Sequence, residues 1–212
     1  MIKGIIFDLD GVIVHTDRYH FAAWKQLAHE LGYTLEEDVN RRLRGVSRMD
    51  SLNIVLENYK GAVLPDREKE ALADRKNEIY QNYLERMTPA EVSDNVRTTL
   101  AELRRRGYKI ALGSSSKNAG IILKKTDLEK AFDAISDGNN IARSKPDPEV
   151  FLKAAEFLGL SPEECIVVED AYAGIDAAKA GNMQAVGIGE AYCYERADYR
   201  IKEFTELLSI LQ

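Results

Sequence analysis

The chain has little cysteine and no long apolar run. Its two cysteines, Cys165 and Cys193, are too few and too far apart to form a disulfide framework. No apolar stretch approaches the ~20 residues of a membrane span. Acidic residues interrupt the short apolar stretch of the N-terminal MIKGIIFDLDG, unlike the apolar core of a signal peptide. We therefore expect a cytoplasmic protein with no membrane partner.

The chain also lacks an excess of basic residues. Its formal net charge is −6, and no block of lysine and arginine stands out, so nucleic acid is not an expected partner. An acidic protein that binds an anionic substrate needs individually placed cations or a metal ion to offset its mean charge. Hydrophobic residues make up 45% and charged residues 30% of the chain, as in ordinary globular proteins. We expect a monomer that binds a small molecule.

Short apolar runs alternate with helical patterns along most of the chain. Strands are predicted at residues 4–7, 109–113, 132–136, 165–169 and 184–189. These runs show little alternation of apolar and polar residues, which is typical of strands buried on both faces of a parallel sheet. Helices are predicted between them, at 94–106, from Asp147–Pro148 to Gly159, and at 171–180. This order predicts a doubly wound α/β sheet, with a closing helix near 202–211.

One interval breaks this alternation. About a hundred residues separate the first two predicted strands, far more than a βα connection needs. Residues 18–31 place Phe21, Trp24, Ala28 and Leu31 on one helical face, and residues 68–86 are again helical in composition. We interpret residues 15–89 as an inserted helical subdomain, with residues 1–14 and 90–212 forming the core.

Two pairs of acidic residues follow predicted strands. Asp8 and Asp10 come at the end of the first strand, and Glu169 and Asp170 end the most apolar one. Ligands bind at this edge of an open α/β sheet, and adjacent carboxylates favour a bound cation with oxygen ligands. The alternatives are a solvated acidic turn for the first pair, and for the second a helix start stabilised by the helix dipole.

Two further polar segments follow strands. GSSSKN at 113–118 brings hydroxyls, a lysine and Asn118 to a predicted helix start, which suits phosphate but equally suits ordinary capping. Lys145 lies in SKPDP just before another predicted helix. A lone lysine in such a segment is usually a solvated surface charge.

Taken in order, these four segments resemble the four motifs of the haloacid dehalogenase superfamily over the whole chain. The resemblance implies a Rossmann-like core with a helical cap. It implies that Asp8 attacks phosphorus to form an aspartyl phosphate, and that Asp10 is the general acid and base. Ser114 and Lys145 would then hold the transferring phosphoryl group. The implied cofactor is Mg²⁺, bound by Asp8, by the backbone carbonyl of Asp10, by Asp170 and by Glu169.

More specific features resemble the β-phosphoglucomutase family. They are Thr16, HFAAW at 20–24, RGVSRMDSL at 44–52, DRKN at 74–77, SSSKN at 114–118 and EDAYAGI at 169–175. The resemblance implies interconversion of β-D-glucose 1-phosphate and glucose 6-phosphate through β-glucose 1,6-bisphosphate. The alternative is a Mg²⁺-dependent sugar-phosphate phosphatase on the same scaffold. A non-catalytic sensor would be marked by loss of Asp8 or Asp10, and both are present.

The same resemblance assigns the remaining site residues. A guanidinium suits bidentate phosphate binding, and the residues expected at the phosphate that does not react are Arg48, Ser116, Lys117 and Asn118. Those expected at the substrate are Arg44, Gly45, Val46, Ser47, Ser51, Lys76, Ser115 and Trp24. Thr16 and His20 are expected among the catalytic residues, with His20 coupling cap closure to Asp10 through a hydrogen bond. His15 departs from the family, which commonly has aspartate at that position, and this concerns the presumed hinge rather than the chemistry.

Overall fold

The computed structural model describes residues 1–43 and 47–211. These residues form two compact units. Met1–His15 with Thr88–Gln212 make up one, here called the core unit, and Thr16–Met87 make up the other, here called the helical unit. In the described part of the chain, no helix combines the length and the apolar character that crossing a bilayer requires.

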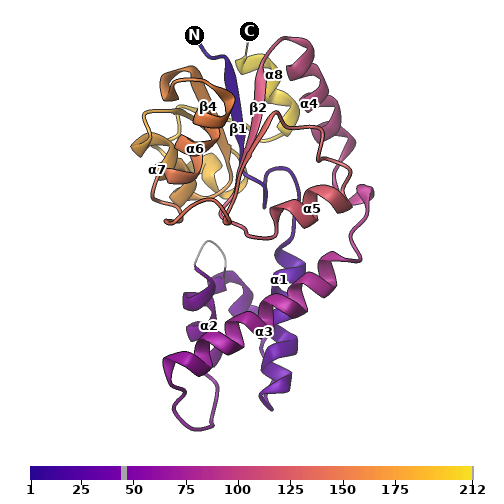
Figure 1. Ribbon diagram of the computed structural model, residues 1–212, viewed down its shortest axis with the longest axis vertical. Coiled ribbons are helices and arrows are strands. Elements are labelled where there is room, and N and C mark those ends of the chain that lie inside the picture. The colour runs from indigo at the N-terminus through magenta and orange to yellow at the C-terminus, as the bar shows by residue number, and fades with distance from the viewer. Residues whose placement is uncertain (44–46, 212) are drawn as a thin grey trace. The chain divides into compact units, whose positions relative to one another are not determined.

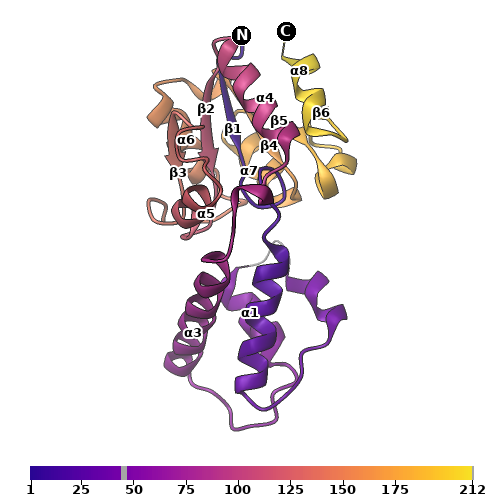
Figure 2. The ribbon, with the colours of Figure 1, turned by 90° about the vertical axis from the view of Figure 1, so that its right-hand side faces the viewer.

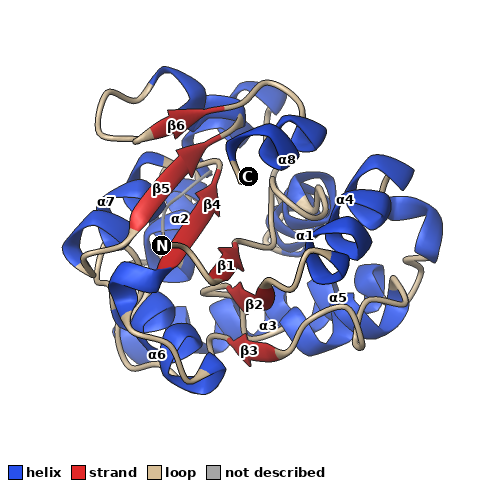
Figure 3. Cartoon of the chain, turned by 90° about the horizontal axis from the view of Figure 1, so that it is seen from above, coloured by secondary structure: helices blue, strands red, loops and turns tan. Residues whose placement is uncertain are grey.

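The core unit is built on a parallel sheet of six strands, drawn in red and seen from above in Figure 3. The strands are β1 (Gly4–Phe7), β2 (Lys109–Gly113), β3 (Ala134–Ser136), β4 (Cys165–Glu169), β5 (Gln184–Gly187) and β6 (Tyr199–Arg200). Their order is β3-β2-β1-β4-β5-β6. Strand β1 pairs with β2 on one side and β4 on the other. Strands β2 and β3 are added outward from one side of β1, and β4, β5 and β6 outward from the other, so the strand order switches direction between β1 and β4. Ligands bind at such a switch point in open α/β sheets.

Helices cover both faces of this sheet, as its double burial requires. Ile6, Ala111, Val167 and Ala185 lie in register on one face and pack against α6 (Glu149–Leu158) and α7 (Tyr172–Ala180). On the other face Phe7 stacks on Phe204, with ring centroids 5.5 Å apart. The elements covering that face are α4 (Asp94–Arg105), the 3-10 turn η5 (Phe204–Glu206) and α8 (Leu207–Ile210).

The remaining elements of the core unit are short. Helix α5 (Ala119–Lys125) follows β2, and the 3-10 turns are η2 (Pro89–Glu91), η3 (Pro162–Glu164) and η4 (Gly189–Cys193). Lys145 lies in the connection between β3 and α6, where its peptide bond to Pro146 is cis. The connections after β1, β2, β3 and β4 thus carry all the polar segments that the sequence singles out.

The helical unit comprises α1 (Asp17–Glu30), the 3-10 helix η1 (Glu37–Leu43), α2 (Arg48–Leu56) and α3 (Asp66–Leu84). Helices α1 and α3 lie side by side in both Figure 1 and Figure 2. Their shared face buries Trp24 and Leu27 from α1 against Ile79, Tyr80 and Leu84 from α3. Burial of these large apolar side chains gives the helical unit a core of its own.

The predicted α/β fold class is confirmed, with differences at element ends. Strand β3 begins at Ala134 rather than at 132, and β5 ends at Gly187. Pro148 is the N-cap of α6, and Gly159, the predicted end of that helix, is left-handed with φ +67°. The closing helix near 202–211 is instead η5 followed by the four-residue α8. That the helical unit acts as a cap stays a prediction.

Candidate active site

Three carboxylates meet at the carboxyl ends of the central strands. Asp8 follows β1, Glu169 ends β4, and Asp170 comes next. Each offers an oxygen that lies within 4.8 Å of those of the other two. The backbone N–H of Asp8 donates to Val168 O (3.0 Å), which continues the β1–β4 pairing up to the site. The parallel register therefore brings Asp8 and Glu169, 161 positions apart in sequence, into one cluster.

Lys145 joins two of these carboxylates. Its Nζ lies 2.5 Å from Asp8 Oδ1 and 2.5 Å from Glu169 Oε1. The three side chains are almost withdrawn from solvent, at 11%, 9% and 2% exposure for Lys145, Asp8 and Glu169. Buried ion pairs are held strongly once formed, because removing one partner leaves an uncompensated charge. The sequence alone left Lys145 open as a surface charge, and the structure removes that alternative.

Burial and mutual repulsion perturb the acidity of the cluster. Burial raises the pKa of Asp8 to about 7, against the lowering influence of Lys145. The pKa of Asp170 is raised to about 8, first by burial and then by the charges of Glu169 and Asp8. Burial alone would lower the pKa of Lys145, but Asp8 and Glu169 raise it above its ordinary value. The ammonium of Lys145 is therefore charged, but it does not neutralise the three carboxylates around it when all of them are ionised.

Two glycines and one backbone amide fix the carboxylates. Glu169 Oε2 accepts from the N–H of Ala171 (2.8 Å), and a Cβ on Gly174 would lie 1.8 Å from Glu169 Oε1. Gly11 has φ +93°, and a Cβ there would lie 2.0 Å from Asp170 Oδ2. Only glycine leaves room for these two carboxylates. Sequence reasoning missed both glycines, although each lies within a segment it had selected.

The cluster suits a hard divalent cation. Its donors are carboxylate oxygens, which Mg²⁺ prefers, and the raised pKa values of Asp8 and Asp170 indicate that additional positive charge would stabilise their ionised forms. The residues with close-set side-chain oxygens are Asp8, Glu169 and Asp170. Asp10 lies in the tight turn after β1, where it bridges to Val14, and its assigned ligand is its backbone carbonyl.

The SSSKN segment forms a compact loop at the end of β2. Ser114 is 2% exposed, and its Oγ accepts from the N–H of Ser116 (3.1 Å). Ser116 Oγ in turn accepts from the N–H of Asn118 (3.2 Å), while Lys117 is exposed. Two of the hydroxyls therefore shape the loop itself, as the capping alternative anticipates. Ser115 lies between them, with its hydroxyl buried and without a hydrogen-bond partner among the described residues.

A second loop supports this one. Gly138 donates its N–H to Ser116 O (3.1 Å), and a Cβ at Gly138 would lie 2.5 Å from Ser115 O. Asn139 Nδ2 donates to Lys117 O (3.0 Å). The DGNN segment after β3 was not among the predicted site residues. The sequence signal that could have identified it is a glycine–asparagine turn directly after a strand.

His20 and Lys76 form a buried pair in the helical unit. Lys76 is 3% exposed, and its Nζ lies 2.8 Å from His20 Nδ1. It also lies 4.7 Å from the Trp24 ring centroid and 4.8 Å from that of Tyr80, within range of a cation–π interaction. Burial, followed by the charges of Lys76 and Arg48, lowers the pKa of His20. A neutral His20 that accepts at Nδ1 carries its hydrogen on Nε2, where it can donate.

The other expected residues of the helical unit lie at helix starts. Thr16 is the N-cap of α1 and is buried. Ser47 caps α2, since its Oγ accepts from the N–H of Asp50 (3.1 Å), and Ser51 is buried one turn later. Arg48 is partly exposed, and its Nη2 donates to Asn77 Oδ1 (3.1 Å). Arg44, Gly45 and Val46 lie outside the described residues.

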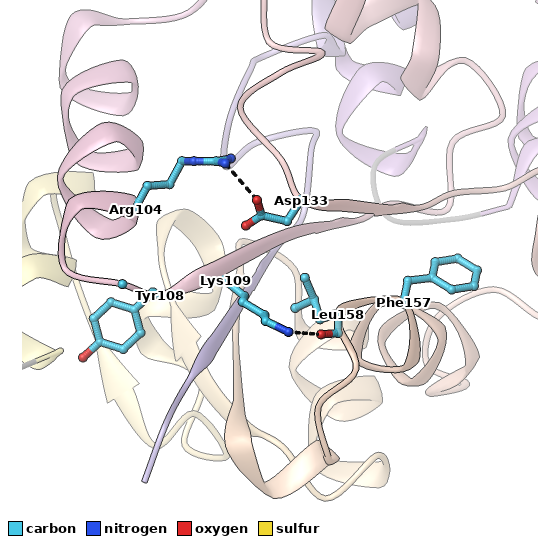
Figure 4. A pocket seen from close by; sticks show the side chains of 7 residues that line it. Arg104, Tyr108, Lys109, Asp133, Phe157 and Leu158 are labelled. Atoms are coloured by element: carbon cyan, nitrogen blue, oxygen red, sulfur yellow. Dashed lines mark hydrogen bonds and ion pairs between the residues drawn. The ribbon is translucent and has the colours of Figure 1, made fainter.

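Two cavities in the described residues lie away from this cluster. One of about 400 Å³ sits at the N-terminal end of β2 and is shown in Figure 4. There Arg104 pairs with Asp133 (2.8 Å), and Lys109 donates to Leu158 O (2.6 Å). Both cations hold structural partners, and the cavity contains none of the predicted site residues. Another, of about 450 Å³, lies on the helical unit beside Tyr83 and Arg86.

Comparisons with known proteins agree with this arrangement. The model of the haloacid dehalogenase-like hydrolase family matches residues 2–182. A β-phosphoglucomutase of Bacillus subtilis is 40% identical over 97% of this chain and 92% of its own length. A crystal structure of β-phosphoglucomutase from Clostridium difficile superposes with a TM-score of 0.85 at 37% identity, covering 98% of this chain and 93% of that one. A phosphorylated carbohydrates phosphatase of Thermotoga maritima is 29% identical over 87% of this chain and 84% of its own.

The family model matches most of the chain, and the Bacillus subtilis relative is 40% identical over nearly the whole of it. The chain belongs to the haloacid dehalogenase-like hydrolase family and, within it, to the β-phosphoglucomutase family.

Proposed function

We propose that the protein is a phosphomutase that interconverts β-D-glucose 1-phosphate and glucose 6-phosphate. The observation that carries this proposal is the buried Asp8–Lys145–Glu169 cluster at the switch point of the sheet, in a chain 40% identical over nearly its whole length to a β-phosphoglucomutase. The cluster supplies a nucleophile and a cation beside it. The similarity supplies the substrate class.

Asp8 acts as the nucleophile in this proposal. A carboxylate oxygen of Asp8 forms a bond to one phosphorus of β-glucose 1,6-bisphosphate as the bond from that phosphorus to the sugar oxygen breaks. Asp10 gives that oxygen its proton, and a glucose monophosphate leaves. In the second half, Asp10 takes the proton from the free hydroxyl of a glucose monophosphate, which attacks the aspartyl phosphate, re-forms the bisphosphate and regenerates Asp8. Lys145 and Ser114 hold the phosphoryl oxygens on which charge develops.

The proposed cofactor is Mg²⁺, held by Asp8, Glu169, Asp170 and the backbone carbonyl of Asp10. When bound, it offsets the repulsion between the anionic nucleophile and the anionic phosphoryl group. Lys145 alone faces two carboxylates, so its positive charge is already shared before substrate arrives.

A mutase has to hold a bisphosphate by one phosphate while the other reacts. We assign this task to Arg48, with Ser116, Lys117 and Asn118, and we assign sugar contacts to the helical unit. The support is the guanidinium of Arg48, held by Asn77 at 3.1 Å and only partly covered, and the exposure of Lys117. The Nε2–H of His20 is a donor suited to a sugar hydroxyl or a carboxylate. We further propose that the enzyme works as a cytoplasmic monomer.

The second candidate is a sugar-phosphate phosphatase. It is favoured by the 29% identity to a phosphorylated carbohydrates phosphatase, and it uses the same nucleophile without a second phosphate site. Product analysis with β- and α-glucose 1-phosphate, each with and without a bisphosphate primer, separates the two. A mutase forms glucose 6-phosphate from the β anomer and depends on the primer. Release of glucose and inorganic phosphate as the main products would put the phosphatase first.

Arg48→Ala gives a second discrimination. Loss of a charge-assisted phosphate contact costs about 2–4 kcal/mol of transition-state stabilisation, which is a roughly 30- to 1000-fold loss in mutase kcat/KM. Acetyl phosphate has no second phosphate, so its hydrolysis should change far less. The matched control is Arg67→Ala on exposed helix surface of the same unit. Equal losses in both reactions would give Arg48 a general structural role, and no loss in either would remove it from the site.

A further inference from the structure

The catalytic lysine sits on a loop with no regular secondary structure. Residues 137–148 connect β3 to α6, and Lys145 lies in this connection with its ammonium 2.5 Å from Asp8 and 2.5 Å from Glu169. A lysine side chain has four rotatable carbon–carbon bonds, so its position depends on how firmly its backbone is held. The contacts that hold this backbone therefore matter for the chemistry.

One carboxylate closes the loop. Glu149, the first residue of α6, accepts from the N–H of Ala142 at Oε1 (3.0 Å) and from the N–H of Arg143 at Oε2 (2.9 Å). Both oxygens are used for consecutive backbone donors, a geometry that only an ionised carboxylate satisfies fully. These bonds lower the pKa of Glu149 below its ordinary value. Its side chain is 16% exposed.

Neighbouring contacts tighten the same loop. Asp147 Oδ1 accepts from the N–H of Glu149 (3.0 Å), and the N–H of Asp147 donates to Ser144 O (3.1 Å). Lys153, one turn along α6, donates to Asn140 O and lies 3.4 Å from Glu149 Oε1. The backbone is thus bound to α6 on both sides of Lys145. On the N-terminal side Lys153 binds Asn140, and Glu149 provides the bonds nearest to Lys145, at Ala142 and Arg143.

Helix α6 is itself fixed to the sheet. Val150, Phe151 and Ala154 are fully buried in the core cluster beneath it, and the Phe151 ring lies 4.7 Å from Lys145 Nζ. Through Glu149, the loop backbone is therefore hydrogen-bonded to a helix that the core holds in place. We propose that Glu149 is a positioning residue, whose carboxylate holds the 142–145 backbone so that Lys145 reaches Asp8 and Glu169. This inference rests on the proposed role of Lys145 in phosphoryl transfer.

The test is a double-mutant cycle between Glu149→Gln and Lys145→Ala. A glutamine keeps the shape but turns an amide NH₂ toward one of the two backbone donors. We expect Glu149→Gln to lower kcat/KM for phosphoryl transfer by about 10- to 100-fold, the loss typical of a misplaced catalytic group. In the Lys145→Ala background the same change should cost no more than about twofold, because the residue it positions is gone. Equal losses in both backgrounds would overturn the proposal.

Hydrogen exchange gives a readout without activity. Glu149→Gln should increase exchange at the amides of Ala142 and Arg143, whereas Glu156→Gln, the same change at an exposed position of α6, should leave it unchanged. Arg143→Ala removes the ion pairs of the Arg143 side chain to Asp147 (3.1 Å) and to Glu149 Oε2 (3.6 Å). It keeps both backbone bonds to Glu149, and so should retain activity. Unchanged exchange in Glu149→Gln would also overturn the proposal.

Two arrangements keep the outcome decisive. If Glu149→Gln does not fold, Glu149→Asp takes its place, since it keeps the charge but withdraws the carboxylate by one carbon–carbon bond. If the wild type lacks mutase activity, the proposed function fails. The exchange experiment and the cycle, run on acetyl phosphate hydrolysis, still test Glu149.

Discussion

At the scale of single residues, the decisive feature is how the partners of each carboxylate hold it in the cluster. Asp8 is buried beside Lys145, while Glu169 has one oxygen on Lys145 and the other on the N–H of Ala171. Glu169 is therefore held in place by its partners, and Asp170 is held against Gly11. This arrangement supports the proposal that Asp8 is the attacking carboxylate.

Asp8→Asn should abolish turnover while the fold persists. Asparagine has nearly the same shape but is not a nucleophile, so kcat should fall by about 10⁴-fold or more. Lys145 keeps its 2.5 Å contact with Glu169, so the buried ammonium still has a partner, and we expect Tm to change by only a few degrees. Steady-state kinetics and a thermal melt check both parts. A variant with near wild-type turnover would contradict the covalent mechanism.

The sequence predicted the chemistry of these residues but not their environment. The order of Asp8, Ser114, Lys145 and Asp170 along the chain resembles the motifs of the haloacid dehalogenase superfamily, and this resemblance implied the reaction. That these residues meet was predictable because parallel strands bring their carboxyl ends to one edge. It could not indicate that Lys76 is buried against His20, because that contact joins residues 56 positions apart. Nor could it indicate that Glu149 holds the lysine loop, since a glutamate at a helix start has an ordinary explanation in the helix dipole.

At the scale of secondary-structure elements, strongly patterned segments were predictable and short ones were not. Strands β1, β2 and β4 are continuous apolar runs buried on both faces, which is the clearest sequence signal that a parallel strand has. Strand β6 has two exposed residues and pairs only with β5. Its formation depends on a tertiary contact, and no local pattern announces it.

Helix α7 contributes to the site through Gly174, whose lack of a Cβ leaves room for the Glu169 carboxylate. Gly174→Ala places a Cβ 1.8 Å from Glu169 Oε1, and that carboxylate cannot move without losing Lys145 or Ala171. We expect kcat/KM to fall about 10- to 100-fold, although alanine favours a helix. Kinetics and Mg²⁺ titration measure the effect.

Gly120→Ala is the matched control. Gly120 also lies in a helix, α5, but a Cβ there meets nothing within 4 Å. This variant should keep full activity and gain about 0.5–1 kcal/mol in free energy of unfolding, because alanine loses less backbone entropy. Similar activity losses in both variants would show that helix substitution, rather than contact with Glu169, is responsible.

At the scale of the whole molecule, the acidic cluster links stability to pH and to metal. In the folded chain the pKa of Asp8 is about 7 and that of Asp170 about 8, against an ordinary value of 3.8. Between pH 3.8 and these raised values, Asp8 and Asp170 keep protons in the folded protein that they have lost in the unfolded chain. Its free energy of unfolding therefore falls as pH rises, with the contribution complete below about pH 4 and lost through pH 7 and 8.

The window from pH 7 to 8.5 isolates this effect. His20 has its pKa lowered, so it is neutral in the folded state there and contributes only near or below its ordinary value of 6.5. Glu102 and Glu164, each with a pKa of about 2, act only in acid. The opposite signs of these groups explain why a broad pH scan would blur the contribution of Asp8 and Asp170.

Without metal, raising the pH from 7 to 8.5 should lower the free energy of unfolding by on the order of 1–2 kcal/mol, or Tm by a few degrees. Saturating Mg²⁺ should reverse the loss and stabilise the protein more at pH 8.5 than at pH 7, because the ligands must be deprotonated to bind it.

Asp170→Asn should flatten this pH dependence of the free energy of unfolding and weaken Mg²⁺ binding more than substrate binding. Activity should vanish with EDTA and return with Mg²⁺. If the metal-free protein gained stability over this range, or Mg²⁺ stabilised it equally at both pH values, the three carboxylates would not form a shared metal site.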